Sequence, residues 1–228
     1  MKKIRIIFTT VLFLSSFVSY AQVHIGLSTG YHSAGTQVSS GISETILPEF
    51  RNIGSPTIGL IAEVGLDNKL SLVSGLHFKQ KGFTSSMGSE FDILGLGIPV
   101  GVKVENRLNY IEVPVHLKFS QGNDKFKAFI SAGPSLSVAR NGTIRALATS
   151  FIDIELTDRS IDFSDPLFNR TNINGDIALG GEMAYGIGKI QVSISYGRSF
   201  GSFLSDNVLN ADLTHSGMTY SIGYSIAL

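Results

Sequence analysis

The feature of this chain that most restricts its fold is an alternation with a period of two, in which large apolar residues alternate with small or polar ones. In residues 217–228, for example, Met218, Tyr220, Ile222 and Tyr224 are separated by single threonine, serine or glycine residues. Successive side chains of a β-strand point to opposite faces, so the pattern predicts strands with two different faces. It recurs in eight segments, which are residues 23–31, 57–66, 69–79, 109–119, 126–138, 174–186, 189–198 and 217–228.

The connections between the eight segments favour one architecture. They are 25, 2, 29, 6, 35, 2 and 18 residues long, so long and short connections alternate. The short ones contain residues that favour turns, namely Asp67-Asn68, Gln121-Gly122-Asn123-Asp124 and Gly186-Ile187-Gly188. Bacterial outer-membrane barrels have this order, with short periplasmic turns and long outer loops. We therefore predict an all-β fold, a single eight-stranded antiparallel up-and-down transmembrane β-barrel with long extracellular loops.

The main alternative is a soluble barrel or sandwich, whose apolar face would point inward and whose polar face would meet water. Only 16% of the residues are charged, below the ~25% of ordinary soluble proteins. The polar faces consist largely of serine, threonine and glycine, whereas soluble surfaces are rich in lysine and glutamate. In a membrane barrel the apolar face points outward to lipid and the small polar residues fill the narrow interior, so the shortage of charged surface residues is no longer a conflict. The composition therefore favours the membrane barrel.

The N-terminus has the pattern of an export signal. Lys2, Lys3 and Arg5 precede an apolar stretch over residues 6–18, and Ser19-Tyr20-Ala21 places small residues at the -3 and -1 positions of a cleavage site. We predict a cleaved signal peptide over residues 1–21 and an outer-membrane β-barrel domain over residues 22–228. The alternative is an N-terminal membrane anchor, but the stretch is shorter than the ~20 residues of a spanning helix.

The absence of cysteine excludes several kinds of site. Without cysteine the chain has no disulfide, thiol nucleophile, thiolate metal site or acylated lipoprotein cysteine. The formal net charge of zero offers no electrostatic reason to expect nucleic acid as a partner. We expect no cofactor and no metal.

Charged residues on the predicted inner faces are the candidate site. They are Glu63, Lys79, Glu112, Lys118, Asp176 and Glu182, with His77 and His116 nearby in the alternation. Unpaired charge in a confined interior is costly, so these groups should pair with one another. We interpret them as a polar network that fills the barrel. The alternative is a path for ions or protons, although eight strands leave no room for a porin-like channel.

The aromatic residues and the long connections suggest further features. Eight aromatic residues near the strand ends are expected in interfacial girdles; they are Phe78, Phe83, Tyr110, Phe119, Phe126, Tyr196, Phe200 and Tyr220. The alternation of residues 151–156 predicts a hairpin above the membrane in the third long connection. The last long connection contains His215, with Asp206, Asp212, Ser199, Ser202 and Ser205 close in sequence. These residue types could form a hydrolase triad, but no Gly-x-Ser-x-Gly elbow occurs, so we expect no enzyme.

One strand carries a family resemblance. Residues 110–118, Tyr-Ile-Glu-Val-Pro-Val-His-Leu-Lys, resemble the hallmark strand of the PorT-like outer-membrane β-barrel proteins of Bacteroidetes. Residues 128–134, the pair Gly181-Glu182 and residues 192–196 are similar to later segments of that family. The resemblance implies an eight-stranded barrel in the cell outer membrane. The namesake of the family takes part in type IX secretion and gliding, whereas most members have no assigned function. This chain departs from common barrels by ending in Ile226-Ala227-Leu228 rather than in an aromatic residue.

These observations together favour a structural or interaction role, associated with secretion or envelope machinery, in which the outer loops or periplasmic turns dock a partner. A narrow conduit or transporter component is the second hypothesis, and a barrel enzyme that acts on lipid is the third. We expect a monomer whose partners are outer-membrane lipid or lipopolysaccharide and envelope or secretion proteins.

Overall fold

The fold is taken from a computed structural model, which describes residues 22–40, 49–93, 96–149, 153–161, 163, 169–202 and 211–228. The predicted signal peptide over residues 1–21 lies outside the described residues. In the part of the chain that is described, no helix has the length and apolar character needed to span a bilayer.

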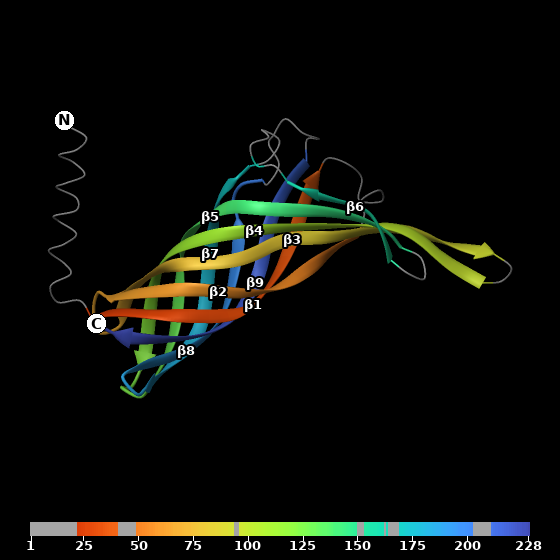
Figure 1. The fold of residues 1–228 in the computed structure, drawn as a ribbon. Coiled ribbons are helices and arrows are strands. Elements are labelled where there is room, and N and C mark those ends of the chain that lie inside the picture. Colours follow the sequence, from red (N-terminus) through yellow and green to blue (C-terminus); the bar gives the residue numbers. More distant parts are fainter. Residues whose placement is uncertain are drawn as a thin grey trace, which may run out of the picture.

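Eight antiparallel strands close into a ring (Figure 1). The ring order is β1, β2, β3, β4, β5, β7, β8 and β9, and β9 pairs with β1 to close it. The strand bounds are β1 Val23–Ser40, β2 Glu49–Gly65, β3 Leu70–Ile93, β4 Leu96–Gly122, β5 Phe126–Thr149, β6 Asp153–Ser160, β7 Thr171–Tyr185, β8 Gly188–Ser199 and β9 Ala211–Ala227. The predicted eight-stranded up-and-down barrel is confirmed. The ninth strand, β6, lies outside the ring and pairs with the far end of β5.

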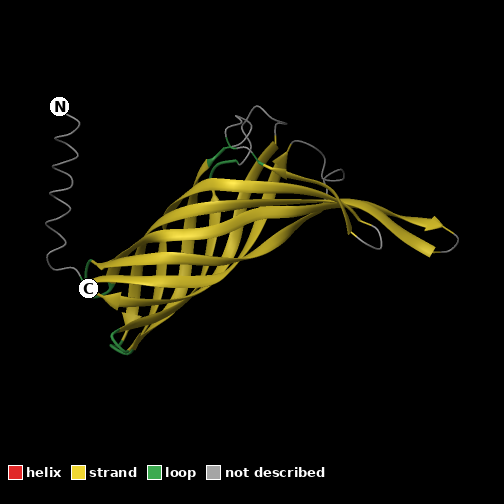
Figure 2. Ribbon diagram, viewed as in Figure 1, coloured by secondary structure: helices red, strands yellow, loops and turns green. Residues whose placement is uncertain are grey.

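The strands continue well past the segments that the alternation marks. β3 and β4 remain paired as far as Ile93 and Leu96, so the predicted 29-residue loop is largely a long hairpin. This hairpin projects beyond the rest of the barrel, at the end opposite to the C-terminus (Figure 1). The hairpin predicted in the third long connection is also present, because Thr143 pairs with Ser160 and Thr149 with Asp153. Figure 2 shows how much of the described chain is strand.

The outer wall carries the apolar side chains. On β7, Leu179 is 60% exposed, whereas the neighbouring Ala178 faces inward and is 8% exposed. Many large exposed apolar residues form a band around the wall, called here the apolar belt: Ile25, Leu27, Tyr31, Ile58, Leu60, Leu72, Phe78, Val113, Val115, Leu117, Phe119, Ile130, Leu136, Ile173, Ile177, Leu179, Met183, Val192, Ile194, Tyr196, Met218, Tyr220, Ile222 and Tyr224. Most of the buried residues are polar or charged. This distribution is the reverse of a soluble barrel and matches a barrel in lipid.

The short connections have the predicted turn chemistry. The Asp67 carboxylate accepts a hydrogen bond from the backbone N–H of Asn68 at 2.6 Å. The side-chain oxygen of Asn123 accepts the backbone N–H groups of Lys125 and Phe126 at 3.0 and 2.8 Å. Gly186 has a φ of 60°, a left-handed conformation that costs little only for glycine. These interactions hold the strand ends together at the short-turn end of the barrel.

The turn between β7 and β8 yields a stability prediction. Gly186→Ala should lower the free energy of unfolding by about 1 kcal/mol, because a Cβ is strained at positive φ. Ile187→Ala is the matched control, since this residue lies in the same turn and is 82% exposed. Urea unfolding in detergent, followed by circular dichroism, measures both variants. An equal midpoint for the two variants would contradict the assigned turn conformation.

Candidate functional site

The interior of the barrel contains two clusters of buried charge. The first, called the turn-side cluster, consists of Glu63 on β2, Lys118 on β4, Glu182 on β7 and Lys189 on β8. Lys118 Nζ lies 3.0 Å from Glu63 Oε2 and 2.5 Å from Glu182 Oε2. Lys189 Nζ lies 2.9 Å and 3.2 Å from the same two oxygens. Two ammonium groups therefore neutralise two carboxylates across the lumen.

Neutral donors complete the turn-side cluster. The Ser71 hydroxyl donates to Glu63 Oε1 at 2.8 Å. The Gln191 amide donates to Glu63 Oε2 and Glu182 Oε2, both at 3.1 Å. Lys118 Nζ also lies 4.4 Å from the centre of the Phe129 ring, where the ring face attracts a cation. The Lys118 side chain is only 2% exposed, so these contacts replace the water that the ammonium group has lost.

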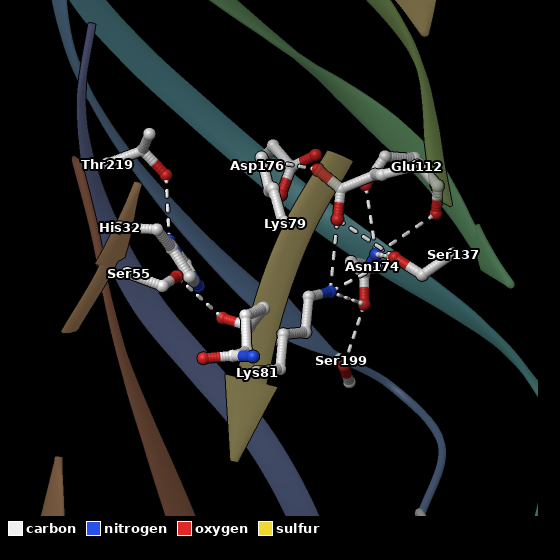
Figure 3. Close-up of polar contacts among 12 residues, drawn as sticks. His32, Ser55, Lys79, Lys81, Glu112, Ser137, Asn174, Asp176, Ser199 and Thr219 are labelled. Carbon is white, nitrogen blue, oxygen red and sulfur yellow. Dashed lines mark hydrogen bonds and ion pairs between the residues drawn. The ribbon is translucent and has the colours of Figure 1, made fainter. Parts of the chain in front are cut away.

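The second cluster, called the hairpin-side cluster, surrounds Glu112 (Figure 3). One carboxylate oxygen of Glu112 pairs with the ammonium group of Lys79, and the other lies 3.0 Å from Lys81 Nζ. The Ser137 hydroxyl donates to this second oxygen at 2.8 Å and accepts from Lys81 Nζ at 3.0 Å. Asn174 extends the network, because its amide donates to Ser137 Oγ at 2.7 Å. Each buried charge here thus has several polar partners.

A cavity of about 120 Å³ lies between the two clusters. Its lining includes His77, His116, Asp176 and residues of both clusters. His116 Nε2 lies 3.3 Å from Asp176 Oδ2. A space of this size with polar groups in its lining can hold a few water molecules, but the two charged clusters bound it along the barrel axis.

An apolar plug lies on the hairpin side of these charges. It consists of Leu108, Tyr110, Ala139 and Ile161, all of which are buried. Tyr110 was expected in an interfacial girdle, and this prediction is wrong. Its position on β4 is in phase with the inward-facing Glu112, so its ring points into the barrel, where Lys81 Nζ lies 5.2 Å from the ring centre. Whether an aromatic side chain faces lipid or the lumen is thus determined by its place in the alternation, and not by how near it lies to the end of the strand.

The sequence-predicted site residues divide between these features. The turn-side cluster contains Glu63, Lys118 and Glu182. The hairpin-side cluster contains Lys79 and Glu112. The cavity between the clusters is lined by the other three, His77, His116 and Asp176. Sequence analysis missed Lys81 and Lys189. Lys81 lies on the same strand face as Lys79, but two residues past the predicted end of that strand. Lys189 lies on the same strand face as Gln191, but it is the first residue of its predicted strand.

The suggested hydrolase residues that the structure describes lie in different places. His215 belongs to β9 and is 2% exposed inside the barrel, so the prediction that it lies in a long loop is wrong. Its Nδ1 lies 3.1 Å from the Thr36 hydroxyl. The hydroxyl of Ser199 donates to Asn174 Oδ1 at 2.7 Å. Ser205, Asp206 and the side chain of Asp212 lie outside the described residues. Among the residues that are described, no group of three or more histidine or acidic side chains is arranged to hold a metal ion.

Comparison with known proteins identifies the family. Residues 19–205 match the model of the outer membrane protein beta-barrel domain. The chain belongs to this family. It is accordingly an outer-membrane protein, and the short turns of such barrels face the periplasm while the long connections face outward. No curated protein matches the chain.

Several solved barrels are similar to the chain in fold. Ail, the attachment invasion locus protein of Yersinia pestis, is 15% identical with a TM-score of 0.41, and the match covers 89% of this chain and 98% of Ail. Neisserial surface protein A is 12% identical with a TM-score of 0.40 and coverages of 89% and 97%. The outer-membrane protease OmpT from Escherichia coli is 8% identical with a TM-score of 0.40 and coverages of 91% and 97%.

The turn-side cluster predicts how the barrel responds to loss of a single charge. Lys118→Met should destabilise the barrel by about 3–5 kcal/mol, because the buried carboxylates lose their central cation. The double variant Lys118→Met with Glu182→Gln is the matched control. It leaves Glu63 and Lys189 as a neutral pair at 2.9 Å and should recover most of the loss. The folded fraction in urea, read from unboiled gels, measures both variants. A double variant no more stable than Lys118→Met would show that charge balance is not the cause.

Proposed function

We propose that this protein is a non-conducting and non-enzymatic outer-membrane barrel that holds an outward-projecting β-platform for an envelope or secretion partner. The observation that carries the proposal is the closed interior. The turn-side cluster, the hairpin-side cluster and the apolar plug succeed one another along the lumen, and each charged group of the two clusters has an oppositely charged partner. A barrel filled in this way acts as an anchor, and its outer extensions are the parts available to other molecules.

The outer extensions are suited to docking. β3 and β4 continue as a pair beyond Gly101, where the pairing of β4 with β5 ends. Among the described strands, β6 has a single hydrogen-bonded neighbour, β5, so its other edge can accept an added strand. We name β6 together with the parts of β3, β4 and β5 beyond the apolar belt the outer platform.

The motif strand supports a finer placement with the PorT-like proteins of Bacteroidetes. Along β4, Tyr110 belongs to the apolar plug, Glu112 to the hairpin-side cluster and Lys118 to the turn-side cluster. Three residues of the motif are therefore among those that fill this barrel. Membership of that group and a role beside secretion machinery are part of the proposal.

The alternative of a narrow conduit finds some support in the cavity between the clusters, whose lining includes His77, His116 and Asp176. Ions could pass only if Lys118 and Glu112 exchanged partners. We also propose that the barrel acts as a monomer, because its own eight strands close the ring.

Planar-bilayer recording and co-purification test this proposal together. The purified protein should give no discrete conductance steps, since the lumen is blocked by paired charges. Replacing residues 87–100 with a two-residue turn should leave a heat-modifiable barrel but remove envelope proteins that cross-link to the wild type. Conductance steps that change in Glu112→Ala or Lys118→Ala would instead establish the conduit. An unchanged set of cross-linked proteins would contradict docking on the outer platform.

A further inference from the structure

A cleft of about 660 Å³ lies on the outer wall of the barrel, at the outward edge of the apolar belt. Its lining includes the paired apolar residues Phe78 and Ile111. The paired Gln80 and Asn109 follow two residues farther along the same strands, and the lining includes them together with Asn141 and Arg140. This feature is called here the Arg140 cleft. Its lining also includes Lys79 and Tyr110, whose side chains face the lumen, whereas the exposed Phe78, Asn109, Asn141 and Arg140 belong to the outer wall.

Hydrogen bonds align the amides of three neighbouring strands along the cleft. The Gln80 amide on β3 donates to Asn109 Oδ1 on β4 at 3.0 Å. The Asn109 amide donates in turn to Asn141 Oδ1 on β5 at 2.9 Å. Because polar side chains are costly among acyl chains, an amide row on the outer wall is expected at the level of the polar headgroups.

A β-bulge places Arg140 at the end of this row. Asn109 pairs with Asn141 and Tyr110 pairs with Ala139, so Arg140 is an additional residue between them. Bulges of this kind redirect a side chain relative to the regular alternation. Both Arg140 and Asn141 are consequently exposed, one after the other, on the outer wall.

Arginine and lysine occupy different regions of the described barrel. All of its arginines are exposed and lie toward the hairpin end; they are Arg51, Arg107, Arg140, Arg145, Arg159, Arg170 and Arg198. Most of the lysines lie inside the lumen or at the short turns. Arginine binds phosphate oxygens through two parallel N–H groups, which lysine cannot do.

Nearby acidic groups neutralise some of these arginines. Arg107 lies 3.3 Å from Glu105, whose pKa is lowered by a hydrogen bond from Lys103, so this carboxylate stays charged. Arg145 lies 3.0 Å from Asp158. Arg140 has no ion pair with any residue in the described ranges, so its charge is available to a ligand.

We propose that the Arg140 cleft binds one phosphorylated acyl lipid of the outer leaflet, the lipid A part of lipopolysaccharide. The phosphate would lie on Arg140 and the amide row, and an acyl chain would pack against Phe78 and Ile111. Charge complementarity selects a phosphate, and the apolar wall below it selects a lipid over a free anion. The proposal goes beyond the docking function, because the cleft lies on the barrel wall at the membrane edge.

Native mass spectrometry of the full-length barrel in nanodiscs tests the proposal. The probes are bisphosphorylated lipid A, dephosphorylated lipid A and inorganic phosphate. The wild type should retain one lipid A molecule, and Arg140→Gln should weaken its binding by about tenfold or more. Arg145→Gln is the matched control, because Arg145 already pairs with Asp158, and it should bind as the wild type does. Dephosphorylated lipid A should bind as weakly to the wild type as lipid A binds to Arg140→Gln.

Three results would overturn the proposal. Equal binding by Arg140→Gln and the wild type would exclude Arg140 as the phosphate ligand. Displacement of lipid A by millimolar inorganic phosphate would indicate a simple anion site, because the acyl chain would then contribute nothing. Unchanged binding by Phe78→Ala, which removes the apolar wall from an exposed position, would exclude the acyl contact.

Discussion

The neutralisation of lysine by carboxylate inside the barrel is the interaction on which the rest of the structure depends. An ammonium group that is 2% exposed, as at Lys118, would be strongly destabilising without partners, and two carboxylates lie within 3.0 Å of it. The same requirement holds at Glu112, which two lysines neutralise. Lys79 and Lys81 reach Glu112 from the neighbouring strand β3. Lys118 on β4 instead reaches Glu63 on β2 and Glu182 on β7, and Lys189 on β8 reaches Glu63, so the turn-side cluster forms only when the sheet is rolled into a barrel. The pairs of Lys118 with Glu63 and Glu182, and of Lys189 with Glu63, thus link strands that are not neighbours, whereas the backbone hydrogen bonds link neighbours.

Strand β4 organises the interior. Tyr110, Glu112 and Lys118 project inward from this single strand and each belongs to a different layer of the filling. The opposite face of the same strand presents Val113, Val115 and Leu117 to lipid. A single strand can therefore meet both the lumen and the lipid, because successive side chains of a strand point to opposite faces. Beyond the apolar belt the strands no longer contact lipid, so neither face of the outer platform has to be apolar. Its side chains are therefore available for the partner contacts that we propose.

Much of this arrangement could be predicted from the sequence. The alternation located all eight membrane-crossing segments because lipid on one side and a narrow lumen on the other impose different residues on the two faces. It failed for the projecting part of the β3–β4 hairpin, since both of its faces lie beyond the membrane and no apolar periodicity is imposed there. The contributions of Lys81 and Lys189 were missed for a related reason, because each lies at or past a predicted strand end. The pair of Lys189 with Glu63 also depends on ring closure, which local sequence does not encode, whereas Lys81 pairs with Glu112 on the neighbouring strand β4.

The hydrogen exchange of lysine ammonium groups, measured by ¹⁵N nuclear magnetic resonance of the folded protein in micelles, tests the central interaction most directly. Lys118 Nζ should give a slowly exchanging signal that disappears in Lys118→Met, because its protons are held by Glu63 and Glu182. The exposed Lys125 in a short turn should exchange too fast to be detected. Exchange of Lys118 as fast as that of Lys125 would show that water reaches the turn-side cluster freely. The charged interior would then be an open polar path rather than a filling.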